Sequence, residues 1–270
     1  MSPIITNPYR FAAATGGWDF TNATWTSGDE FYVGSQDTVP QGVSLSKTGY
    51  KMYMTGSGGT DYIYEYDLST AWDITTASYL QSGAVTSGAT NPTDLFVKED
   101  GTELYFSDSN AQGIYQMTMS TPWDVTTATA TNVIAAPDTT VLGLFLRDDG
   151  TSVWSCGMGG DRVYMQTLST PWDISSAGTA TNIYVGGTDN TPYGVFVKPD
   201  GTKFWMVGGQ YSRITEWGMS SAWDVTSATY SSVYKSTNDS VPTAVTWSDD
   251  GTSMYEMGLS TDKIYQWAVP

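Results

Sequence analysis

The sequence predicts an all-β fold: a five-bladed β-propeller with four-stranded antiparallel blades, in which the N-terminal strand closes the ring by pairing into the last blade. Two independent markers recur along the 270 residues with a period of about 50 residues. The first is a Trp-Asp pair, which stands at residues 18–19, 72–73, 123–124, 172–173 and 223–224. The second is a turn glycine, which stands at Gly49, Gly101, Gly150, Gly201 and Gly251. Only 14% of the residues are charged, and Gly, Ser, Thr and Asn are abundant, as is typical of short strands joined by many turns.

The first strand of each repeat is expected to be the innermost one. It is a short and nearly continuous apolar run, such as DLFVK at 94–98 or GVFVK at 194–198. Such a run is expected for a strand that is covered on both faces. It ends at an Asp-Gly or related pair, which supplies the positive φ of a hairpin turn. The inner strands are expected to begin near residues 40, 92, 141, 192 and 242.

The second strand follows the turn directly, as in KFWMV at 203–207, and the third alternates, as in IYQMTM at 114–119. The Trp-Asp segment comes next and leads into the fourth strand. Its Asp precedes two hydroxyl or similar residues, an arrangement in which a carboxylate accepts backbone N–H bonds and clamps a turn. We interpret the pairs as structural anchors, with a ligand-stacking platform as the alternative. These anchors are Trp18, Asp19, Trp72, Asp73, Trp123, Asp124, Trp172, Asp173, Trp223 and Asp224.

The two ends of the chain predict how the ring closes. The last residues, KIYQWAVP at 263–270, match a third strand, so the fifth repeat lacks its fourth. Residues 15–36 contain a Trp-Asp turn and the entry to such a strand, so they are expected to complete the last blade and to protect its edge. Residues 15–270 then form one propeller domain, and residues 1–14 form an N-terminal extension or tether.

Composition disfavours several classes of partner. The chain has 11 Lys and Arg against 28 Asp and Glu, a net charge of −17, so we expect no nucleic-acid partner bound through phosphates. No stretch approaches the ~18 apolar residues of a membrane span, so we expect no membrane insertion. Histidine is absent, which removes the commonest general base and transition-metal ligand. We expect no cofactor and no metal site, and Cys156 is expected to be a buried, inert thiol.

One acidic position lies in the loops that join fourth to first strands. Twelve residues before each turn glycine stand Asp37, Ala89, Asp138, Asp189 and Asp239. An Asx-type turn before the inner strand is one interpretation. The other is a ring of polar acceptors around the channel mouth that binds sugar hydroxyls or a hard cation such as calcium.

The loops that join second to third strands differ among the copies, as expected of a recognition surface on a constant frame. The fourth blade has the most side chains able to stack and to form hydrogen bonds, and we expect it to be a contact point. The candidate ligand-binding residues are Asp37, Asp138, Asp189, Asn190, Tyr193, Tyr211, Arg213 and Asp239.

No catalytic constellation stands out. The lack of His excludes Ser-His-Asp chemistry, and no Gly-x-Ser-x-Gly elbow is present. A pair of carboxylates for glycoside hydrolysis stays open, because the chain has 28 acidic residues.

The segments LSTPWDI at 168–174 and FVKPDGTK at 196–203 resemble a propeller repeat of tailed-phage structural proteins and related bacterial and environmental sequences. The opening NPYRF at 7–11 is similar to the start of small phage virion proteins. The resemblance implies a non-enzymatic virion protein: a head fibre, decoration or tail-associated module that presents a propeller for host attachment. Other virion proteins, bound through residues 1–14, and a cell-surface glycan are the implied partners. A free-standing lectin-like binder and, less favoured, a glycan-active enzyme are the alternatives.

Overall fold

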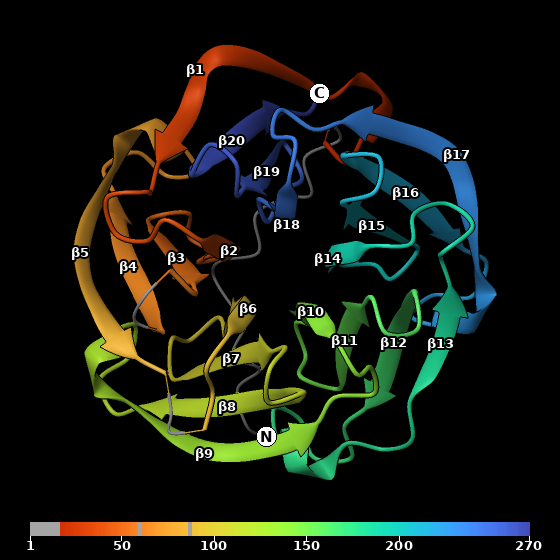
Figure 1. Cartoon of the computed structure of the whole chain (residues 1–270), viewed down its shortest axis with the longest axis horizontal. Coiled ribbons are helices and arrows are strands. Elements are labelled where there is room, and N and C mark those ends of the chain that lie inside the picture. The colour runs from red at the N-terminus through yellow and green to blue at the C-terminus, as the bar shows by residue number, and fades with distance from the viewer. Residues whose placement is uncertain (1–16, 59–60, 86–87) are drawn as a thin grey trace, which may run out of the picture.

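The computed structural model describes residues 17–58, 61–85 and 88–270. These residues form five four-stranded antiparallel sheets arranged as blades around a central axis, which confirms the predicted five-bladed propeller (Figure 1). The predicted extension at 1–14 lies outside the described residues.

Each blade runs outward from its inner strand in chain order. The first four blades are β2 (Pro40–Leu45), β3 (Lys51–Gly56), β4 (Tyr62–Leu68) and β5 (Ala77–Ala84); β6 (Pro92–Val97), β7 (Glu103–Asp108), β8 (Gly113–Met119) and β9 (Ala128–Ala135); β10 (Val141–Leu146), β11 (Ser152–Gly157), β12 (Arg162–Thr167) and β13 (Thr181–Tyr184); and β14 (Pro192–Val197), β15 (Lys203–Gly208), β16 (Arg213–Met219) and β17 (Ala228–Ser236). A short 3-10 turn follows each Trp-Asp pair: η1 (Phe20–Asn22), η2 (Ile74–Thr76), η3 (Val125–Thr127), η4 (Ile174–Ser176) and η5 (Val225–Ser227).

The fifth blade draws on both ends of the chain. It contains β18 (Pro242–Trp247), β19 (Ser253–Gly258) and β20 (Lys263–Ala268), and its outer strand is β1 (Thr24–Tyr32). Thr24 pairs with Ala268 and Tyr32 with Lys263, so β1 lies antiparallel to β20. Figure 1 shows the red β1 along the outside of the blue β20. The predicted closure of the ring by the N-terminal strand is therefore confirmed.

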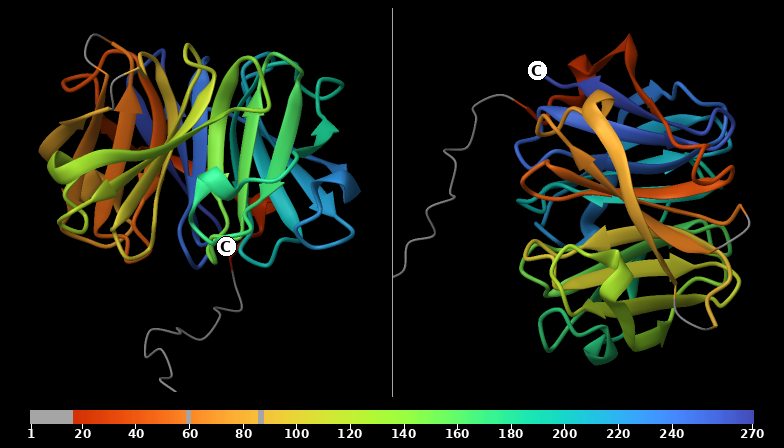
Figure 2. Two further views of the ribbon diagram at one scale, coloured as in Figure 1. Left: turned by 90° about the horizontal axis from the view of Figure 1, so that it is seen from below. Right: turned by 90° about the vertical axis from the view of Figure 1, so that its left-hand side faces the viewer.

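The ring has two unlike faces. The loop face carries the connections from fourth to first strands and from second to third strands, and the turn face carries the turn glycines and the Trp-Asp segments. Figure 2 shows the blades edge-on between these faces, with the C-terminus at the turn face. The described chain also begins there: Gly17 N–H donates to the Pro270 carbonyl (2.9 Å) and Trp18 N–H donates to the Gly251 carbonyl (2.9 Å).

The core lies between the blades, since each sheet buries its faces against its neighbours. Every residue of β10 is buried, as expected for an inner strand. One cluster joins Trp154 of the third blade to Phe204 and Trp217 of the fourth, and Cys156 lies fully buried within it. Burial raises the pKa of the Cys156 thiol well above its usual range, which keeps the thiol protonated and inert. Among the described residues, no helix has the length and apolar character needed to span a bilayer.

Candidate functional site

The Trp-Asp pairs form one repeated turn geometry. All five tryptophans have positive φ, between 64° and 70°, a conformation that is rare for residues other than glycine. Each Trp N–H donates to the carbonyl of its blade's turn glycine at 2.8–2.9 Å. A Cβ on any of the five turn glycines would collide with the facing indole. The indole therefore rests on the glycine, which explains why the two markers share one period.

The aspartates of these pairs cap the 3-10 turns. Asp73, Asp124, Asp173 and Asp224 each accept the backbone N–H two residues on, at 2.9–3.0 Å. Asp19 instead accepts from the Asn22 side-chain amide at 2.7 Å. This geometry supports the interpretation of the pairs as structural anchors.

The four loop-face aspartates clamp two loops together. Asp189 accepts from Thr191 N–H (2.9 Å) in its own loop and from Gln210 and Tyr211 N–H (both 3.2 Å) in the neighbouring loop. Asp37, Asp138 and Asp239 make the same kinds of bond. All four are at most 5% exposed. Their carboxylates thus face the protein's own N–H groups, as in an Asx-type turn, and their role as ligand contacts stays a prediction.

The hydrogen-bond donors around Asp239 also set the charge state of its carboxyl group. Burial alone would raise the pKa of Asp239, but hydrogen bonds from the side chains and N–H groups of Ser260 and Thr261 and from Val241 N–H hold it below its usual range. Asp239 is therefore an anion whose acceptors are taken up inside the fold.

The second blade has the same clamp with its partners exchanged. Ala89 stands at the aspartate position, and Asp108 stands where the other blades have a glycine. Asp108 accepts from Thr90 and Asn91 N–H and from Ala111 N–H, all at 2.7 Å. In the other blades that glycine is needed, since a Cβ there would collide with the clamp aspartate or its loop. The clamp carboxylate therefore occupies an equivalent position in the second blade. It comes there from the end of β7 and not from the loop before the inner strand.

The fourth blade carries an arginine held between two exposed tyrosines. The Arg213 guanidinium lies 4.6 Å from the ring centroid of Tyr211 and 5.0 Å from that of Tyr234, within cation–π range. Its Nη2 donates to the Thr188 carbonyl at 2.7 Å. Tyr211 is 57% exposed and Tyr234 52%.

Arg213 has unused binding capacity. None of the ion pairs in the described part of the chain involves it, and its buried Nε–H has no partner there. The Arg213 guanidinium therefore has no carboxylate partner among the described residues, and its side-chain hydrogen bond goes to a backbone carbonyl.

The third blade repeats this arrangement in simpler form. Arg162 occupies the same place as Arg213, twelve residues after the turn glycine, and its guanidinium lies 5.7 Å from the ring centroid of Tyr184, which is 53% exposed. Arg162 also donates to Asn182 Oδ1 at 2.6 Å. The loop from β13 to β14 joins the two arginine sites, since it follows Tyr184 directly and contains the acceptor of Arg213. We call these side chains the tyrosine–arginine rim: Arg162, Tyr184, Tyr211, Arg213 and Tyr234.

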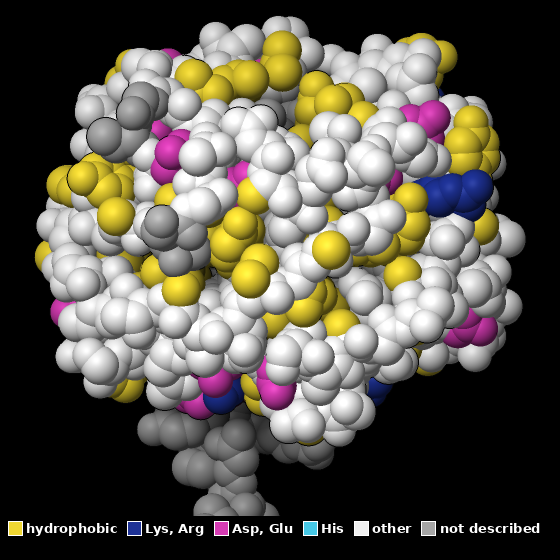
Figure 3. Space-filling view, turned by 60° about the horizontal axis from the view of Figure 1, so that its bottom comes forward, with side chains coloured by type: hydrophobic (Ala, Val, Ile, Leu, Met, Phe, Trp, Pro, Cys, Tyr) yellow, Lys and Arg dark blue, Asp and Glu magenta, His cyan; other side chains and the backbone are white. Residues whose placement is uncertain are grey.

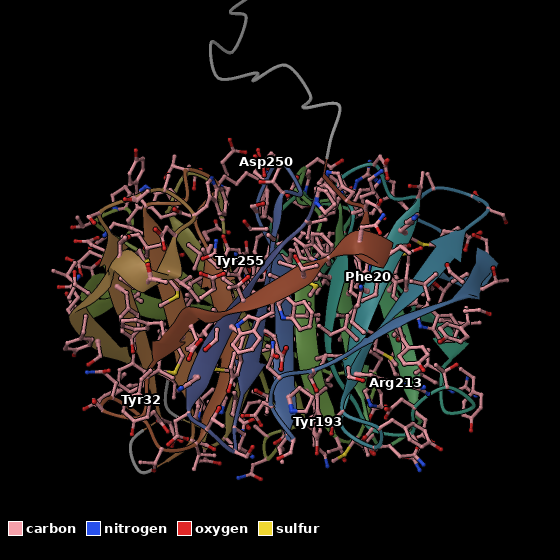
Figure 4. All side chains as sticks on the ribbon, turned by 90° about the horizontal axis from the view of Figure 1, so that it is seen from above. Phe20, Tyr32, Tyr193, Arg213, Asp250 and Tyr255 are labelled. Carbon is pink, nitrogen blue, oxygen red and sulfur yellow. The ribbon has the colours of Figure 1, made fainter. Side chains whose placement is uncertain are left out.

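The other candidates of the fourth blade lie apart from this rim. Tyr193, the second residue of β14, is half-buried beside Gly209 and packs against the core cluster around Trp205. Asn190 is exposed, and its backbone N–H donates to Gln210 Oε1 at 3.1 Å. Figure 4 shows Tyr193 and Arg213 toward the loop face and Asp250 at the opposite edge of the ring. The structure thus brings Tyr211 and Arg213 into contact and turns Tyr193 inward.

Sequence reasoning missed Arg162, Tyr184 and Tyr234. Arg162 could have been found, because it shares the repeat position of Arg213. The tyrosines could not, since their placement depends on the register of the outer strands. Tyr234 pairs with Thr215 across an irregular stretch of β17.

Charged groups are sparse on the side of the molecule drawn in Figure 3, where acidic and basic side chains are scattered among polar atoms and apolar side chains. Within residues 17–58, 61–85 and 88–270, no group of three or more acidic or thiol side chains is arranged to hold a metal ion.

No protein-family model and no curated protein matches this sequence. Among solved structures, the chain is similar to a "putative 6-phosphogluconolactonase" from Bacteroides fragilis, with a TM-score of 0.52 and 12% identity over 81% of this chain and 64% of that one. A protein of the same description from Bacteroides uniformis gives a TM-score of 0.52 and 12% identity over 80% and 63% of the two chains. The chain thus spans less than two thirds of either protein. At this identity the likeness shows the propeller fold alone.

Proposed function

We propose that this protein is a non-enzymatic recognition module of a tailed-phage virion that binds an acidic cell-surface glycan through the tyrosine–arginine rim. The observation that carries the glycan part is Arg213, a guanidinium with no carboxylate partner, placed between two exposed phenol rings. A guanidinium offers a planar fork that matches a carboxylate, and tyrosine combines a flat apolar face with a polar tip. An acidic sugar presents both an anionic group and an apolar ring face.

The position of Gly17, the first residue that the structure describes, supports attachment from one side. Gly17 lies at the turn face, whereas the rim lies toward the loop face (Figures 2 and 4). Anchoring through the preceding residues would therefore point the variable loops away from the particle.

A glycan array with matched neutral and acidic sugars tests the recognition. We expect the full chain to bind sugars that carry carboxylates, and Arg213→Met or Tyr211→Ala to weaken that binding about tenfold, as loss of a charge-assisted contact or of a stacking face implies. Lys263→Met is the matched control: Lys263 stands at the same repeat position in the fifth blade but is paired with Glu30 (3.4 Å), so its loss should leave binding unchanged. Failure to bind any glycan, or unaltered binding by Arg213→Met, contradicts the proposal.

Mass spectrometry of purified particles tests the virion part. We expect the protein at a stoichiometric copy number. Absence from particles, together with agglutination of glycan-coated beads by the free protein, would favour the lectin alternative instead.

A further inference from the structure

The fifth blade buries an acidic residue at a position where the other four blades have no charge. Glu256 lies within β19, five residues after the turn glycine, and its side chain is fully buried. Its counterparts in the first four blades are Met54, Phe106, Ser155 and Met206. The fold therefore does not need a carboxyl group here, and packing alone does not explain its presence.

Three N–H groups surround the carboxyl group of Glu256. Its Oε1 accepts from Asp239 N–H at 3.0 Å, and its Oε2 accepts from Asn238 N–H at 3.2 Å and from the Trp267 indole N–H at 3.1 Å. None of the ion pairs in the described part of the chain involves Glu256. A buried carboxylate without a cation is costly, whereas a protonated carboxyl group keeps the capacity to accept hydrogen bonds.

The groups around Glu256 offer no free cation to balance its charge. The titratable groups on the elements packed around it are Asp239 and Asp262 in the loops, Lys263 and Tyr265 on β20, Glu30 on β1 and Tyr193 on β14. Lys263 is already paired with Glu30 at 3.4 Å, and Asp239 is held as an anion by its own donors. The remaining packed strands, β18 and β2, contain no titratable side chain.

This environment places the ionisation of Glu256 near neutral pH. Burial, with a smaller contribution from the neighbouring Asp239, raises the pKa of Glu256 to about 7, although the three N–H donors act in the opposite direction. The chain has no histidine, the side chain that usually titrates in this range. When Glu256 ionises, it releases its proton to solvent and leaves two buried carboxylates beside each other.

The loop that rests on Glu256 also holds part of the tyrosine–arginine rim. Thr237 donates to the Ser212 carbonyl from its backbone N–H at 2.9 Å and from its hydroxyl at 2.7 Å. Ser212 Oγ donates in return to the Ser240 carbonyl at 2.7 Å. Ser212 is the residue between the stacked tyrosine and arginine of the fourth blade, so the loop at 237–241 connects Glu256 to both of them.

We propose that Glu256 is a positioning residue that couples the rim to pH. While Glu256 is protonated, the loop at 237–241 lies on an uncharged group and keeps Tyr211 and Arg213 in place. When Glu256 ionises, its repulsion with Asp239 and its hydration loosen that loop and, through Ser212, the rim. This loosening is a property of the protein alone, and only its effect on glycan binding rests on the proposed function.

Urea unfolding of the full chain at pH 6 and pH 8 tests whether Glu256 carries this response. An unfolded glutamic acid has a pKa of about 4.3 and is ionised at both pH values, so the stability that protonated Glu256 contributes is lost as the pH rises through 7. We expect the folding equilibrium constant of the wild type to fall about tenfold more over this range than that of Glu256→Gln. The comparison with the variant removes the contribution of Asp94, a second buried carboxyl group whose pKa burial raises.

Two further variants keep the outcome clear. Glu216→Gln is the matched control, because it removes a buried carboxylate that is paired with Lys203 at 3.0 Å; it should keep the wild-type response to pH. Glu256→Met should abolish the response as Glu256→Gln does. It decides the question if Glu256→Gln does not fold, because methionine stands at the same position in the first and fourth blades.

Hydrogen exchange measures the loosening itself and needs no ligand. We expect the protection of the backbone amides at 237–241 and 211–213, corrected for the intrinsic rate at each pH, to fall by up to about tenfold from pH 6 to pH 8 in the wild type. In Glu256→Gln it should stay constant. Equal responses of the wild type and Glu256→Gln in unfolding, or unchanged protection of these two segments in the wild type, would overturn the inference.

A glycan array at the two pH values connects the inference to recognition. Acidic sugars should bind the wild type more weakly at pH 8 than at pH 6, and should bind Glu256→Gln alike at both. Absence of glycan binding at either pH would contradict the proposed function alone, since hydrogen exchange then still decides whether Glu256 controls the rim. Equal loss of affinity in the wild type and in Glu256→Gln would count against the inference and not against glycan recognition.

Discussion

A single carboxylate in each loop-face connection decides whether two neighbouring loops hold together. In four blades it comes from the loop before the inner strand, and in the second blade Asp108 supplies it from the end of β7. The exchange with Ala89 shows that the position of the charge matters and that its origin in the sequence does not. In the other four blades a glycine faces the aspartate, because no room is left there for a Cβ.

The second blade allows this exchange to be tested as a double-mutant cycle. Asp108→Gly should lower the free energy of unfolding by about 2–3 kcal/mol, because it leaves the buried N–H groups of Thr90, Asn91 and Ala111 without an acceptor. Ala89→Asp alone should also destabilise, because it places a second carboxylate beside Asp108. The double variant should regain most of the loss in urea unfolding. A double variant no more stable than either single one would refute the exchange.

At the scale of the element, the Trp-Asp turn joins a strained tryptophan to a turn glycine in every blade. The same turns also tie blades together: the hydroxyl of Tyr255 in the fifth blade donates to the Trp72 carbonyl in the first at 2.7 Å, and Tyr53 in the first donates to the Trp123 carbonyl in the second at 3.1 Å. The strain at tryptophan is therefore offset by contacts within and between blades.

A glycine-to-alanine change tests this coupling. Gly150→Ala should cost about 2–4 kcal/mol, because the residue has a φ of +71° and its new Cβ would push the Trp172 indole off its support. Gly187→Ala, in the loop between β13 and β14, is the matched control: a Cβ there meets no atom within 4 Å, so the change should stay within about 0.5 kcal/mol. Equal effects of the two changes on chemical unfolding would contradict the account of the turn.

The strands and turns could be predicted from the sequence because each marker recurs and each apolar run is short. The Asx-type clamps could also be predicted from the repeat, and Tyr193, Tyr211 and Arg213 were the reason to expect a contact point on the fourth blade. Tyr234 could not be found this way. In β17, Tyr234 pairs with Thr215 and Tyr230 with Trp217, so three residues oppose one, and no local pattern fixes such an irregular register.

The ion pairs that Lys47 makes with acidic residues of three other blades were out of reach for a related reason. Its partners are Glu99, Asp148 and Asp249, and their meeting depends on where side chains point across the axis. A repeat pattern places equivalent residues in a ring but does not say which of them touch.

At the scale of the whole molecule, the N-terminal segment connects two blades by aromatic packing. Trp18 stacks on Phe196, Trp205 and Trp247 with centroid distances of 6.1, 5.7 and 5.3 Å. Phe20 is 1% exposed and meets Trp205 and Trp247 edge-on. The segment that completes the fifth blade therefore also fastens it to the fourth.

Truncation measures the contribution of this segment. Removal of residues 1–30 should lower the melting temperature sharply and promote aggregation, because each buried aromatic lost costs about 3–5 kcal/mol and the edge of β20 is left unpaired. The chain that starts at residue 17 is the reference. A melting temperature equal to that of the reference would count against closure.

Closure of the ring by β1 is the claim on which the fold depends, and a crosslink between its paired residues tests it most directly. Tyr32 and Lys263 are Cα partners across β1 and β20, whereas Asp29 lies in the stretch where that pairing is interrupted. Under oxidation, Tyr32→Cys/Lys263→Cys should form an intramolecular disulfide within the monomer and raise the melting temperature, and Asp29→Cys/Lys263→Cys should not. Failure of the first pair to crosslink, or equal crosslinking of both pairs, would contradict a ring sealed by its own N-terminal strand.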